Sequence, residues 1–106
     1  MPMTTHRKIA FQRIADAARA NCAAIVTQWL PSGRHLGIEW CALNPRRNDR
    51  RIGSFRINLK TGAWADFAID ERGGDLISLA AYLFALSQAE AALRVARMLG
   101  VNPYAD

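Results

Sequence analysis

The chain has 106 residues, which is enough for one domain with a modest hydrophobic core and leaves no room for a second. Because 51% of the residues are hydrophobic, the composition excludes a disordered chain. The formal net charge of +5 favours nucleic acid or another anionic partner, although charge alone fits an ordinary soluble domain equally well.

The cysteines and the hydropathy bear on the compartment. Cys22 and Cys41 form neither a disulfide framework nor a metal motif, so we expect free intracellular thiols. No window approaches the roughly 20 apolar residues of a membrane span. The N-terminal residues also lack the apolar segment of a signal peptide. We therefore expect a cytoplasmic protein that makes no membrane contact.

The first predicted element is a helix over residues 4 to 30. Thr5 is its candidate N-cap, and apolar residues then recur at steps of three and four along one helix face. Asn21 is a position at which the helix can kink or restart, and Pro31 follows its end. Cys22 lies on the apolar face, which favours a buried thiol over a reactive one.

The second predicted part, residues 36 to 68, is β. Apolar and polar residues alternate in three segments, 38–43, 54–58 and 64–67. A short glycine-containing turn joins the last two segments as a hairpin. Three short antiparallel strands are the simplest count, and so small a sheet needs a helix over one face.

The third predicted part is a helical hairpin that ends at Gly100. Asp75 is the candidate N-cap of its first helix, and Ser87 with Glu90 forms a capping box that opens its second helix. The expected fold is α+β, with a single domain over residues 1–106. A small three-stranded antiparallel sheet packs against the N-terminal helix and the C-terminal helical hairpin.

Positive charge is concentrated in residues 31 to 60. Seven basic residues stand against two acidic ones there, which gives +5 and equals the excess of the whole chain. Arginine suits phosphate because its planar guanidinium donates two parallel hydrogen bonds. A solvated loop is the alternative for the arginines at positions 46 to 51. The candidate phosphate-binding residues are Arg34, Arg46, Arg47, Arg50, Arg51, Arg56 and Lys60.

Aromatic residues alternate with these charges in the predicted strands. Exposed aromatic side chains on a basic sheet can stack unpaired bases. Trp40 and Trp64 are the candidates, because each is large enough to be partly exposed at a sheet edge. The alternative is that both tryptophans belong to the core, which is where we expect Phe55.

Five short motifs occur in order through the middle of the chain. They are Leu30-Pro31, Leu43-Asn44-Pro45, Ser54-Phe55, Trp64-Ala65-Asp66-Phe67 and Gly73-Gly74-Asp75. In this order they resemble the N-terminal zinc-ribbon domain of bacterial and phage DNA primases, over about residues 25 to 84. The resemblance implies contact with DNA, typically a single-stranded template, in the replication or transfer of plasmid, phage or integrated elements. A replicative helicase or primase is the protein partner that it implies.

The family's metal positions hold no zinc ligands in this chain. Asn44 and Arg47 stand where the family has its first Cys and its His, and Asp66 and Ile69 stand at the second ligand pair. Four-coordinate zinc needs closely paired Cys or His. We therefore expect no structural zinc and no cofactor. We expect Asn44 and Asp66 to hydrogen-bond the loops that zinc would tie together.

The sequence thus predicts a metal-free DNA-binding module, with single-stranded DNA favoured. The chain has no room for the family's polymerase domain and shows neither acidic metal-binding clusters nor a nucleophile paired with a base, so we do not expect an enzyme. The alternative function is a protein-interaction adaptor for a replication protein. It would act through Tyr82, Phe84 and Leu86 of the helical hairpin.

Overall fold

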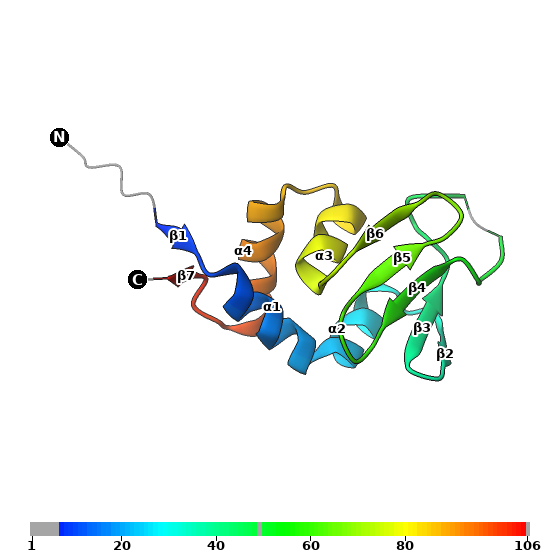
Figure 1. Ribbon diagram of the computed structural model, residues 1–106, viewed down its shortest axis with the longest axis horizontal. Helices are drawn as coiled ribbons and strands as arrows, with labels where there is room; N and C mark the ends of the chain where they lie inside the picture. The colour runs from blue at the N-terminus through cyan, green and yellow to red at the C-terminus, as the bar shows by residue number, and fades with distance from the viewer. Residues whose placement is uncertain (1–6, 49, 106) are drawn as a thin grey trace.

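The computed structural model describes residues 7–48 and 50–105. It is an α+β fold, as expected, with most of the helices at one end and the sheet at the other (Figure 1). In chain order the elements are β1 (Lys8–Ile9), α1 (Phe11–Ala20), α2 (Cys22–Trp29), β2 (Arg34–Leu36), β3 (Glu39–Ala42), β4 (Phe55–Asn58), β5 (Trp64–Asp66), β6 (Glu71–Gly73), α3 (Leu76–Phe84), α4 (Gln88–Leu99) and β7 (Tyr104–Ala105).

The main sheet has five strands instead of the predicted three. Strands β2 to β6 form an antiparallel meander in which each strand pairs with the next along the chain. The strands missing from the prediction are the two edges, β2 and β6, each of three mostly exposed residues. Neither edge has the alternating apolar pattern that marks a half-buried strand, so only pairing with a neighbour identifies it.

The predicted N-terminal helix is two helices, α1 and α2, separated at Asn21. Helix α1 ends at Ala20 and α2 begins at Cys22, so the structure confirms a restart as the correct one of the two alternatives. The side-chain amide of Asn21 donates to the carbonyl of Ala17 at 2.9 Å. Helix α1 begins at Phe11, later than predicted, because β1 pairs with β7 just before it. The candidate N-cap Thr5 lies outside the described residues.

The C-terminal helical hairpin is confirmed, together with its caps. The carboxylate of Asp75 accepts from the amide of Ser78 at 2.8 Å. Ser87 and Glu90 form the reciprocal capping box at the start of α4. Gly100 ends α4 in the left-handed region with φ 69°, a conformation that glycine adopts without a Cβ penalty.

The helices cover one face of the sheet only. Helix α2 passes behind the strands and α3 lies beside β6 (Figure 1). Alternate sheet residues, including Ala42, Phe55, Ile57 and Trp64, point to the helices and join one core cluster with the buried residues of all four. Of the described helices, none lies on the opposite face, which we call the open face.

Two further expectations concern the thiols and the membrane. Burial raises the pKa of the Cys22 thiol, and both Cys22 and Cys41 are free and buried. Within residues 7–48 and 50–105 no single helix is long and apolar enough to cross a membrane, and the α3–α4 pair that reaches this length together is bent by 110°.

Candidate nucleic-acid interface

The carboxylate of Asp66 is the centre of a buried cluster that joins three segments of the chain. Its Oδ2 accepts from Asn44 Nδ2 at 2.8 Å, and both of its oxygens accept from one Arg47 guanidinium nitrogen at 3.0 and 3.1 Å. The amide of Ala68 donates to Oδ1 at 3.0 Å. Asn44 Nδ2 also donates to the hydroxyl of Tyr82 at 2.8 Å, which ties the cluster to α3.

This cluster unites Asn44, Arg47 and Asp66, which stand at three positions that hold metal ligands in the family that the motifs resemble. The expectation that Asn44 and Asp66 hydrogen-bond their loops is confirmed, because they bond to each other and accept from the backbone amides of Arg46 and Ala68. The donor set does not fit zinc, because a carboxamide and a guanidinium are not zinc ligands and Arg47 already brings a cation to Asp66. Ile69, at the fourth position, is exposed. Among the described residues no three His, Cys, Asp or Glu side chains are grouped to hold a metal ion.

Hydrogen bonds keep the buried Asp66 ionised. Burial alone would raise the pKa of this carboxyl, but the hydrogen bonds from Asn44, the Ala68 amide, Arg47 and Ser54 outweigh it and bring the pKa below its ordinary value. Asp66 and Arg47 are therefore a structural ion pair, and the positive charge of Arg47 is balanced inside the fold.

The open face carries a row of side chains that crosses all five strands. Direct pairing aligns Arg34, Cys41, Arg56, Ala65 and Arg72, one from each of β2 to β6. Paired residues point to the same side of a sheet, so three arginines alternate with two small residues across this face. The arginines on the two edge strands are exposed.

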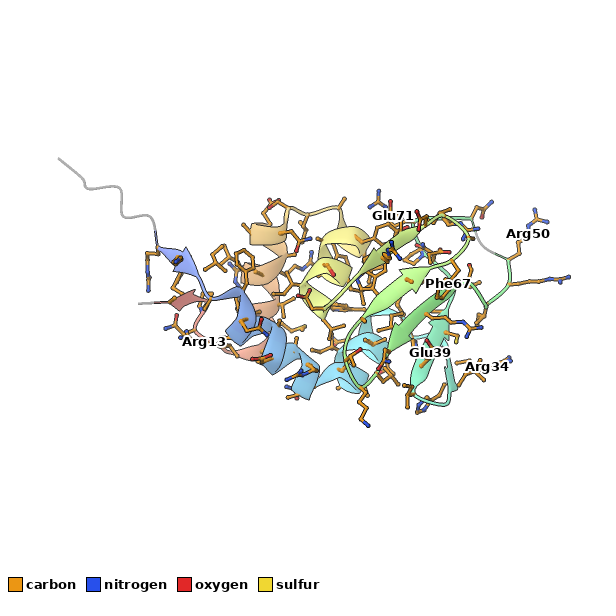
Figure 2. All side chains as sticks on the ribbon, in the orientation of Figure 1. Arg13, Arg34, Glu39, Arg50, Phe67 and Glu71 are labelled. Carbon is orange, nitrogen blue, oxygen red and sulfur yellow. The ribbon has the colours of Figure 1, made fainter. Side chains whose placement is uncertain are left out.

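One aromatic ring stands on the open face. Phe67 follows β5 two residues after Ala65, so it points to the same side, and it is 72% exposed. Beside it a hollow of about 210 Å³ is lined by Glu39, Arg56 and Asn58 among other residues. Figure 2 shows Arg34, Glu39 and Phe67 together over the strands. The central arginine of the row is partly balanced here, because its guanidinium donates to Glu39 at 3.2 Å.

The two candidate tryptophans have other partners. Trp64 is only 5% exposed, stacks on Tyr82 with ring centroids 5.0 Å apart, and donates its indole N–H to Ser78 Oγ at 2.9 Å. Trp40 is half-buried and donates its indole N–H to the carbonyl of Leu30 at 2.9 Å. Both side chains belong to the core or its margin, which leaves Trp64 no free face for a base.

The remaining candidate cations lie in loops at the sheet end of the molecule. Arg50 and Arg51 are exposed in the β3–β4 loop, and Figure 2 shows Arg50 extending away from the strands. Arg46 is exposed but held on α3, where its guanidinium donates to the carbonyl of Tyr82 at 2.7 Å and lies over the ring. Lys60 is exposed in the β4–β5 turn.

Two residues of this surface, Phe67 and Arg72, were not among the predicted site residues. Phe67 has a sequence signal, since it continues the period-two alternation of the strand that contains Ala65. Arg72 has none, because it lies in the unpredicted strand β6 beside two acidic residues.

Comparison with known proteins adds no assignment to this geometry. No family model matches the chain, and no curated protein matches it.

Proposed function

We propose that the chain is a nucleic-acid-binding module that holds single-stranded DNA on the open face of its sheet. The observation that carries the proposal is the row of Arg34, Arg56 and Arg72 beside the exposed ring of Phe67. Guanidinium groups bind phosphates, and an exposed ring stacks on an unpaired base of any identity. A duplex hides the faces of its bases, so an aromatic platform favours single strands.

The exposed arginines of the β3–β4 loop extend the same basic surface. Arg50, which Figure 2 shows beyond the strands, and its neighbour Arg51 add two exposed cations in this loop. Arg47 is not one of the proposed contact residues, because its charge is already paired with Asp66. The proposed contact residues are thus five arginines and one aromatic residue: Arg34, Arg50, Arg51, Arg56, Arg72 and Phe67.

We also propose that the chain is related to the primase zinc-ribbon domain and acts in DNA replication or transfer without catalysis of its own. The support is spatial, because Asn44, Arg47 and Asp66 match ligand positions in the motif order and meet in one cluster. An Asp–Arg pair with an Asn then ties the loops that zinc ties in the family.

Fluorescence anisotropy with a labelled single strand and its matching duplex tests the proposed function. Changing Arg34 and Arg72 to Ala together should weaken single-strand binding and lower the slope of log affinity against log salt by roughly 0.7 for each phosphate that is no longer neutralised. Phe67→Ala should cost about 1–3 kcal/mol on the single strand and little on the duplex. Arg97→Ala is the control, because Arg97 is an exposed arginine on α4. If the double variant keeps both affinity and salt slope, the proposal fails.

The adaptor alternative has no specific support in the helical hairpin. Tyr82, Phe84 and Leu86 are only half-exposed and pack against the core. Phe84 lies edge-on to Trp29 with ring centroids 5.5 Å apart, and the guanidinium of Arg94 covers its ring. These side chains already have intramolecular partners, so we do not propose a docking role for them.

A further inference from the structure

Strand β2 is a sheet edge whose outer side pairs with no other described strand. Gly37 and Ile38 connect β2 to β3 as a two-residue turn, with Gly37 at φ 59°, so Leu36 and Glu39 close the hairpin as a hydrogen-bonded pair. Such pairs alternate with non-hydrogen-bonded pairs along antiparallel strands. The amide and carbonyl of His35 therefore point outward, away from β3. An outward donor and acceptor on one residue are what an added strand requires.

Apolar side chains gather around this edge. Leu36, Ile38 and Leu43 are three of the seven large apolar side chains that are exposed among the described residues, and Ile38 is 56% exposed. A hollow of about 220 Å³ lies at the start of β2, between Trp29, Gly33 and Leu43. Its walls are mostly apolar, so it suits one aliphatic side chain of an extended segment.

The charge beside the edge is positive. Arg34 is exposed on the open face of β2, and within the described chain no carboxylate lies within 4.0 Å of its guanidinium. The nearest acid on the neighbouring strand, Glu39, already pairs with Arg56 at 3.2 Å. A second copy of this chain, with its net charge of +5, would bring the same cation to the edge. An acidic segment is the complementary occupant.

We propose that the β2 edge binds an extended segment of a partner protein by strand addition, and that acidic and apolar residues alternate in this segment. Successive side chains of an added strand face opposite sides of the sheet. One set therefore lies on the open face, where β2 presents Arg34 together with Leu36, and the other lies on the helix side, toward the apolar hollow beside Gly33. This surface is separate from the proposed nucleic-acid contact except for Arg34, and the inference does not depend on that function.

A peptide in which valine alternates with glutamate is the probe, and a peptide of the same composition with the two residue types in separate blocks is its control. We expect the alternating peptide to bind more tightly in anisotropy and to protect the His35 amide from hydrogen exchange in the full chain. His35→Pro should weaken binding roughly tenfold, because it removes the outward donor and no ladder bond. Arg34→Glu should weaken it further than Arg97→Glu, the matched change on α4.

The exchange measurement uses the unaltered protein and keeps the test valid even where His35→Pro does not fold. Equal binding of the two peptides overturns the proposal, because affinity would then depend on the composition of the peptide and not on the alternation of its residues. Equal effects of Arg34→Glu and Arg97→Glu also overturn it. Protection of the His35 amide by single-stranded DNA but not by the peptide assigns the edge to nucleic acid instead. Protection that rises with protein concentration alone assigns it to a second copy.

Discussion

Replacing Asp66 with alanine removes the acceptor that Asn44, Arg47 and the Ala68 amide share. Breaking a buried ion pair costs about 3–5 kcal/mol, because it leaves a buried partner unpaired. The Arg47 side chain retains 30% exposure and can reach water, which places the expected loss at the lower end, about 3 kcal/mol. The buried Asn44 adds to this cost, since its side-chain amide loses the bond to Asp66 and keeps the one to Tyr82.

Denaturant unfolding followed by circular dichroism measures this loss at pH 7. A lower midpoint denaturant concentration means lost stability if the slope of the unfolding free energy against denaturant concentration is unchanged. A changed slope means an altered folded or unfolded state. The matched control is Asp16→Ala, since Asp16 also pairs with an arginine, Arg19, but at 3.6 Å on the surface. Surface pairs of this kind contribute little, so the control should unfold at the native midpoint.

The pH dependence supplies an independent check on Asp66. Its pKa is lowered in the folded state, so its ionisation stabilises the fold above the ordinary pKa of about 3.9. This stabilisation is lost as the pH falls through the lower native-state pKa. The difference in free energy of unfolding between the native protein and Asp66→Ala should therefore become smaller below about pH 4. A gap below about 0.5 kcal/mol at pH 7 would refute the structural role of the pair.

Three further outcomes are expected in the same unfolding assay. Gly73→Ala should lower the free energy of unfolding by about 1–3 kcal/mol, because a Cβ there meets the hydroxyl of Ser78 and the indole nitrogen of Trp64. Gly74→Ala has open space around its Cβ and should lose far less. Ser87→Ala should cost about 1 kcal/mol through loss of the cap of α4, and Ser87→Thr should restore most of it. Phe67→Ala should leave the midpoint unchanged, because the ring is 72% exposed, and a large loss would place the ring in the core.

Local signals account for the parts of the fold that the sequence predicts. The caps at Asp75 and Ser87 depend on residues three positions apart, and both are present as predicted. The β4–β5 hairpin follows from alternation and its turn glycine, Gly62, which has φ 82°. The edge strands β2 and β6 have no such local signal, because a neighbour's backbone and not a buried face holds them in the sheet.

The sequence by itself determined the helical hairpin, the central strands, the concentration of arginine and the polar identity of residues 44, 47 and 66. Only the tertiary structure decided which of these side chains have partners. It buries Trp64 against Tyr82, pairs Arg47 with Asp66, and leaves Phe67 exposed on the open face, where it lines the same hollow as Arg56. The physical reason is that burial and pairing depend on strand register and on which face the helices cover. Both bring together residues that are far apart along the chain.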